Sequence, residues 1–122
     1  ENIFLFGLKA NEVDELWQKG YNPNDFMTPE LQRVFDMLTS GVLGQHYDDL
    51  VASLLTNRFG VADPYMTVAD FSDYCREQEV VAKTYTDRRK FAEMSLVNIA
   101  KAGIFSSDRS VREYADKIWN LK

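Results

Sequence analysis

Apolar residues at the start of the chain form one short continuous run, unlike the periodic patterns that follow. Residues Ile3 to Phe6 are all apolar and the run stops at Gly7, which is typical of a strand buried on both faces. Both edges of a strand need hydrogen-bonding neighbours, and the later patterns are helical. We therefore expect the neighbouring strands, and sequence upstream of this chain, to be missing here.

After Gly7 the apolar residues recur three and four positions apart, which predicts helices bounded by capping residues, glycines and prolines. The expected helices run from Asn11 to Gly20, Thr28 to Gly41, about Tyr47 to Phe59, Asp70 to about Tyr85, Thr86 to Gly103, and Ser107 or Ser110 to Trp119. The chain is thus predicted to be mostly α, with one N-terminal strand and about six helices. No linker or repeat divides it, so residues 1–122 are interpreted as a single segment.

The last two predicted helices carry apolar residues in different patterns. The fifth has them nearly all round, at Phe91, Met94, Leu96, Val97, Ile99 and Ala100, which is typical of a helix buried between other elements. The sixth has one apolar stripe, formed by Val111, Tyr114, Ala115, Ile118 and Trp119. Ser110 with Glu113 fits a capping box, and Asp108 complements the helix dipole. This pattern predicts a helix held against a partner surface.

Composition and charge exclude several classes of partner. The chain has 122 residues, 45% hydrophobic and 13% aromatic, which is enough for one compact core. A net charge of −5 argues against nucleic acid and anionic membranes, which need a concentrated basic patch. No apolar run approaches 18 residues, so no membrane span is predicted. The single cysteine, Cys75, excludes an internal disulfide and favours a reducing compartment such as the cytoplasm.

Candidate chemical groups are few, and each has a structural explanation. His46 lies in a loop without a nucleophile placed for it, so a solvated histidine is expected. Cys75 falls on the apolar side of its helix and is predicted to be a buried hydrophobe. One His and one Cys cannot build a usual zinc site. The carboxylate pairs Asp48–Asp49 and Asp70–Asp73 lie at predicted helix starts, where they complement the dipole.

The sequence carries only weak signals for the binding of phosphate or sugar. None of the six glycines forms a phosphate-binding loop. The lysines are predicted on polar helix faces or ends, at Lys9, Lys19, Lys83, Lys90, Lys101, Lys117 and Lys122. Four aromatic residues could stack on sugar rings if exposed, although core or loop anchoring is the commoner role, namely Tyr21, Phe26, Tyr47 and Tyr65. The residues alone therefore predict no catalytic, cofactor-binding or metal-binding site.

Two stretches resemble the glycogen and maltodextrin (α-glucan) phosphorylase family. They are ENIFLFG, from Glu1 to Gly7, and GIFSSDRSVREYADKIW, from Gly103 to Trp119. Between them, KGYN at 19–22, DPYMTVADFSDY at 63–74 and VNIA at 97–100 are similar to the same family. The similarity runs the length of the chain and departs from the family mainly around Gly41 to Tyr47, where the family varies in length.

The resemblance implies a C-terminal fragment of a larger enzyme. The chain would be the C-terminal part of the second Rossmann-like α/β domain, plus the terminal helices, of a two-domain (GT-B type) glycosyltransferase. Such enzymes use pyridoxal phosphate to phosphorolyse α-1,4-glucans to glucose 1-phosphate, and the cofactor lysine lies upstream of the position that matches Glu1. The resemblance thus implies no catalytic residue and no cofactor in this chain. In the family the final helix crosses back to the first domain.

Two interpretations of the chain predict different partners. If the chain is a phosphorylase fragment, it would be inactive alone and would pack against the remainder of the enzyme. The whole enzyme would be a cytoplasmic homodimer. As a free-standing helical interaction module of the same descent, it would bridge other partners. The orphan strand favours the fragment, because a free module would be expected to blunt or omit it. Exposed docking faces also predict that the isolated chain self-associates.

Overall fold

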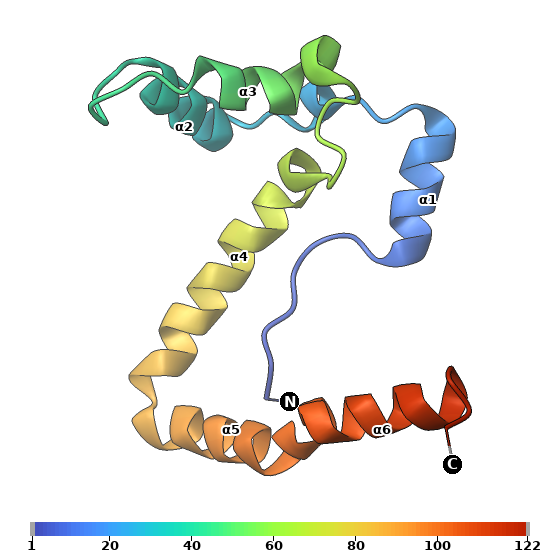
Figure 1. Cartoon of the computed structure of the whole chain (residues 1–122). Helices are drawn as coiled ribbons and strands as arrows, with labels where there is room; N and C mark the ends of the chain where they lie inside the picture. Colours follow the sequence, from blue (N-terminus) through green and yellow to red (C-terminus); the bar gives the residue numbers. More distant parts are fainter. Residues whose placement is uncertain (1, 122) are drawn as a thin grey trace. The chain divides into compact units, whose positions relative to one another are not determined.

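The computed structural model describes residues 2–121, apart from the side chain of Phe59; Glu1 and Lys122 lie outside the described residues. The regular elements of these residues are six α-helices and three 3₁₀ helices, labelled in Figure 1. They are α1 (Ala10–Lys19), η1 (Pro23–Phe26), α2 (Pro29–Thr39), α3 (Asp48–Leu55), η2 (Asn57–Phe59), α4 (Thr67–Thr86), α5 (Arg88–Lys101), η3 (Ala102–Phe105) and α6 (Ser107–Lys117). The prediction of about six helices is confirmed.

The described residues divide into two compact units, and each is described by itself. The core unit is Leu5–Glu79, and the terminal unit consists of residues 2–4 and 80–121. The division falls within the sequence of α4. It separates the residues that form a buried core from those that do not.

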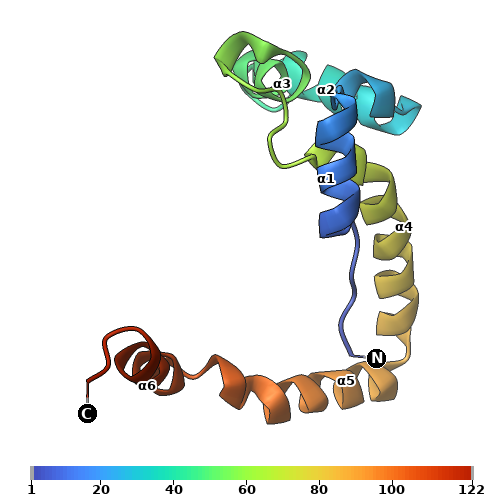
Figure 2. The same ribbon diagram turned by 90° about the vertical axis from the view of Figure 1, so that its right-hand side faces the viewer.

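The buried centre of the core unit lies where α2 meets the start of α4. Leu31, Phe35 and Val68 are 5%, 4% and 2% exposed. Around them pack partly buried residues from η1 and the position after it, and from α2, α3 and α4, namely Phe26, Met27, Val34, Leu38, Val51, Leu54, Leu55 and Phe71. Helix α3 lies beside α2 in both views (Figures 1 and 2). Burial of each large apolar side chain stabilises this unit by about 1.5–3 kcal/mol.

Helix α4 begins at Thr67, three residues before the predicted start at Asp70. The cause is Asp63, which is 1% exposed. Its Oδ1 accepts the Thr67 N–H at 2.9 Å and its Oδ2 accepts the Val68 N–H at 2.7 Å. The first free N–H groups of the helix are thereby satisfied.

The strand predicted over Ile3 to Phe6 is not formed. These residues have no regular secondary structure, and Ile3, Leu5 and Phe6 are 59%, 68% and 51% exposed. A strand is held by hydrogen bonds to a neighbouring strand. The other regular elements within residues 2–121 are helices, so no such neighbour is supplied.

Other helix ends follow local hydrogen bonds. Helix α1 begins at Ala10 rather than after Asn11, because Glu12 Oε2 accepts the Lys9 N–H at 2.7 Å. Gly20 ends it with a φ of 85°, as predicted. Helix α3 ends at Leu55, earlier than predicted, and a 3₁₀ turn continues to residue 59.

Helix α5 is not buried between other elements in this structure, contrary to the prediction. No residue of α5 is buried, and Leu96 and Ile99 are 64% and 71% exposed. Within the terminal unit, Phe91 packs edge to face on Tyr85 at 5.1 Å between ring centres, and Asn98 Nδ2 donates to the Asn2 carbonyl at 2.9 Å. Apolar residues all round a helix need partners on several sides, and the described part of this unit does not supply them.

Candidate functional site: the apolar stripe of α6

The stripe predicted on the last helix is present and faces solvent, but α6 ends at Lys117 instead of the predicted Trp119, so that Ile118 and Trp119 follow the helix. Val111, Tyr114, Ile118 and Trp119 are 60%, 52%, 63% and 60% exposed, and Ala115 is partly buried. The Tyr114 and Trp119 rings lie 6.1 Å apart. We call these five residues the α6 stripe. An exposed row of large apolar side chains on one helix is typical of a surface that binds another protein element.

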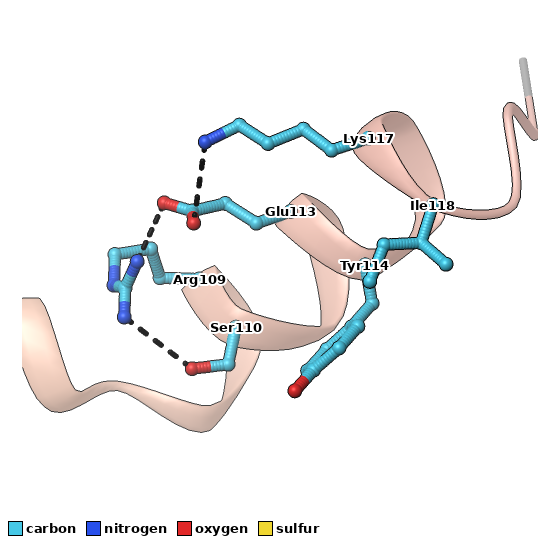
Figure 3. Close-up of a pocket in the computed structure, with 6 residues that line it drawn as sticks. All are labelled: Arg109, Ser110, Glu113, Tyr114, Lys117 and Ile118. Atoms are coloured by element: carbon cyan, nitrogen blue, oxygen red, sulfur yellow. Dashed lines mark hydrogen bonds and ion pairs between the residues drawn. The ribbon is translucent and has the colours of Figure 1, made fainter.

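A row of charged residues borders the α6 stripe (Figure 3). Glu113 lies between two cations on the same helix: its Oε1 is 2.5 Å from Arg109 Nη1 and its Oε2 is 3.4 Å from Lys117 Nζ. The Arg109 hydrogen bond, followed by the pair with Lys117, lowers the pKa of the Glu113 carboxyl. These charges neutralise one another within the helix.

A shallow groove of about 270 Å³ separates the stripe from the charged row. It is lined by residues of α6 and the position just after it, namely Arg109, Ser110, Glu113, Tyr114, Lys117 and Ile118 (Figure 3). The capping box predicted between Ser110 and Glu113 is not formed. Ser110 Oγ instead donates to the Ser106 carbonyl at 3.3 Å, one turn earlier, because α6 begins at Ser107 and Ser110 is already inside it.

His46 is exposed, as expected, but its ring is anchored. Nδ1 donates to the Thr39 carbonyl at 2.6 Å, which places the proton on that nitrogen. The ring lies against Gly41, where an added Cβ would come 2.8 Å from Nε2. These contacts give His46 a role in fixing the loop after α2.

The prediction that Cys75 is buried is wrong, because the thiol is exposed. Asp48 and Asp49 lie in the first turn of α3, as predicted. Asp49 also pairs with Arg58 at 3.5 Å between Oδ1 and Nη1.

Asp70 and Asp73 have a role that the sequence interpretation missed. Asp73 Oδ2 accepts the Gly7 N–H at 2.9 Å and Asp70 Oδ1 accepts the Leu8 N–H at 2.8 Å. The Gly7 hydrogen bond, followed by that of Arg76, lowers the pKa of the Asp73 carboxyl. Carboxylates one turn apart on α4 thus fix the chain entering α1. The sequence signal that could have indicated this contact was Gly7, the glycine that ends the apolar run.

The four candidate aromatic residues have different roles. Tyr21 donates to Asp63 Oδ2 at 2.8 Å, and burial, followed by this hydrogen bond, raises the pKa of its hydroxyl above the usual value of 10.0. Phe26 packs against the core. Tyr47 precedes α3 and its N–H donates to the Leu38 carbonyl at 3.0 Å. Tyr65 alone of the four is fully in solvent, with 88% of its surface exposed.

The described residues do not fit a bound pyridoxal phosphate. The six lysines between positions 2 and 121 are all exposed, and Lys117, which lines the groove on α6, is paired with Glu113. The same residues hold no group of three or more His, Cys, Asp or Glu suited to a metal ion. None of the helices described here could span a membrane.

Comparison with known proteins gives matches over the whole chain. The family described as "Carbohydrate phosphorylase" matches residues 1–121. Similar proteins include the glycogen phosphorylase of Synechocystis sp., 39% identical, and the muscle form of human glycogen phosphorylase, 37% identical. The α-1,4 glucan phosphorylase L isozyme of Vicia faba is 40% identical. Each match covers 100% of this chain but only 14%, 15% and 12% of the respective relative.

Proposed function

The chain belongs to the carbohydrate phosphorylase family, and we propose that it is the C-terminal portion of an α-1,4-glucan phosphorylase. That enzyme would phosphorolyse glycogen or maltodextrin to glucose 1-phosphate. The observation that carries the proposal is the similarity, 37–40% identical across the whole chain, to glycogen and α-glucan phosphorylases. The C-terminal position rests on the resemblance of residues 103–119 to the final helix of that family.

The role we propose for the chain is to hold the enzyme together, while other parts of the enzyme supply the chemistry. The exposed α6 stripe supports this role, because burial of its large side chains is worth about 1.5–3 kcal/mol each. Its partner would be the first domain of a two-domain (GT-B type) enzyme. Residues 3–6 would join the sheet of the second, Rossmann-like domain, where neighbouring strands complete their hydrogen bonds.

The cofactor and assembly belong to the same proposal. Pyridoxal phosphate would supply a phosphate group for acid–base chemistry, and its lysine would lie outside this chain, because the described lysines do not fit it. We also propose a cytoplasmic homodimer for the whole enzyme. The single cysteine, exposed on α4, is compatible with a reducing compartment.

A chimera tests the proposal. The matching segment of the Synechocystis glycogen phosphorylase is replaced by this chain, and glucose 1-phosphate is measured with maltodextrin and inorganic phosphate. We expect the chimera to be active and the same enzyme without the segment to be inactive. A chimera that folds, as shown by circular dichroism and size, yet releases no glucose 1-phosphate would contradict the proposal.

The matched control places Ile118→Asp in the chimera and compares it with Lys117→Asp. Both introduce an aspartate at the C-terminal end of α6, Lys117 being its last residue and Ile118 the next, but only Ile118 belongs to the α6 stripe. We expect Ile118→Asp to reduce activity at least tenfold and Lys117→Asp to retain most of it. Equal effects would refute the docking role of the stripe.

A further inference from the structure

The apolar run from Ile3 to Phe6 does not determine its own register in a sheet. Side chains of a strand point alternately to its two faces, and a slip of one residue moves each side chain to the other face. Such a slip is costly where one face is polar, but all four residues of this run are apolar. If the run joins a sheet, as proposed above, a contact outside the run must set its register.

The two residues that follow the run are fixed to α4 within the core unit. Asp73 Oδ2 accepts the Gly7 N–H at 2.9 Å and Asp70 Oδ1 accepts the Leu8 N–H at 2.8 Å. Asp73 is itself held by Arg76, whose Nη2 lies 2.6 Å from Asp73 Oδ1. These bonds form although residues 3–6 have no regular secondary structure, so they do not depend on a sheet. We call Gly7, Leu8, Asp70 and Asp73 the Gly7 clamp.

The Gly7 clamp accepts a single register. Gly7 has a φ of 90°, and a Cβ at this position would lie 2.7 Å from Asp70 Oδ2, which is closer than the two atoms can pack. The neighbours Phe6 and Leu8 both carry a Cβ. A slip in either direction would therefore press a side chain against the carboxylate and force it into left-handed backbone, which glycine tolerates best.

We propose that the Gly7 clamp sets the register, and the end point, of the strand formed by residues 3–6 in the whole enzyme. In open α/β sheets, ligands bind outside the carboxyl ends of the strands, and Gly7 lies at that end of the run. Asp70 and Asp73 would thus be positioning residues for one edge of the cleft. This inference rests on the proposed function, because the sheet belongs to the whole enzyme.

A matched pair of glycines tests the clamp in the full-length protein that carries this chain. Gly7 and Gly20 are both left-handed, with φ of 90° and 85°, but a Cβ on Gly20 meets no atom within 4 Å. We expect Gly7→Ala to lower the thermal unfolding midpoint and to reduce release of glucose 1-phosphate from maltodextrin and phosphate about tenfold. Gly20→Ala should retain most of both. Equal effects would attribute the loss to backbone strain alone and overturn the proposal.

Substitutions of Asp70 separate the clamp from a helix-dipole effect. Asp70→Ala removes the acceptor of the Leu8 N–H and should match Gly7→Ala, whereas Asp70→Asn keeps an acceptor oxygen and should restore release. If the charge acted only on the dipole of α4, the asparagine would be no better than the alanine, and the proposal would fail. Glu79→Ala removes an exposed carboxylate of α4 outside the clamp and should change neither readout.

Insertions test the register directly. An alanine inserted between Phe6 and Gly7 changes the spacing between the run and the clamp, whereas an alanine inserted between Leu8 and Lys9 does not. We expect the first insertion to lower both release and the unfolding midpoint more than the second. Equal effects would mean that the sheet sets its own register, which overturns the inference. Without release from the unsubstituted protein the proposed function fails, and the unfolding midpoints of the two insertions still decide whether the clamp sets the register.

Discussion

The core unit and the terminal unit use similar apolar side chains for different purposes. In the core unit, Leu31 and Phe35 lie on one side of α2 and are 5% and 4% exposed. In the terminal unit, Val111 and Ile118 belong to the α6 stripe and are 60% and 63% exposed. Both helices are amphipathic, so a stripe alone does not show whether its partner is in the same chain. Only contacts do.

The largest expected effect is on the core. Phe35→Ala should lower the free energy of unfolding of the chain by about 3–5 kcal/mol, because it removes a buried ring and leaves a cavity. Leu96→Ala, in the terminal unit, should lower it by less than about 0.5 kcal/mol, because that side chain is 64% exposed. Urea unfolding followed by circular dichroism measures both. Equal losses would show that the two units do not differ in packing.

The second largest loss in the free energy of unfolding is expected at Asp63. Asp63→Ala removes the acceptor of two N–H groups and of the Tyr21 hydroxyl, so we expect a loss of about 3 kcal/mol. Tyr21→Phe removes one of these hydrogen bonds and should lose about 1 kcal/mol. The same urea titrations apply. If Tyr21→Phe costs as much as Asp63→Ala, the cap at Thr67 and Val68 contributes nothing.

The sequence predicted elements well where neighbouring residues decide them. Thr28 caps α2 with a 3.2 Å bond from the Leu31 N–H, and Gly20 ends α1, as expected. The start of α4 was misplaced because its cap, Asp63, acts from four residues away through a left-handed turn. Cys75 was misplaced because periodicity gives a side of a helix, and the presence of a partner on that side is a tertiary fact. The strand at 3–6 failed for the same reason.

The Asp73 carboxyl gives a smaller, pH-dependent effect. Its pKa is lowered in the folded chain by the Gly7 N–H and then by Arg76. Its contribution to stability is therefore fully present above the ordinary pKa of the unfolded chain and is lost as the pH falls through the lower folded pKa. Carbon NMR titration should place the midpoint below 3.8, the ordinary value. Arg76→Gln should raise the midpoint only in part, because the Gly7 N–H remains; full return to 3.8 would contradict the assigned order of causes.

The smallest effect on folding should come from the α6 stripe, and it is the one that separates the two units most clearly. Ile118 is 63% exposed, so Ile118→Asp should change the free energy of unfolding by less than about 0.5 kcal/mol. The same change should abolish self-association of the isolated chain, which light scattering on a sizing column measures over a range of concentrations. A core substitution would do the reverse, lowering stability without a specific effect on association. If the unsubstituted chain is a monomer at every concentration, the stripe has no affinity for itself, and its partner must offer a differently shaped surface.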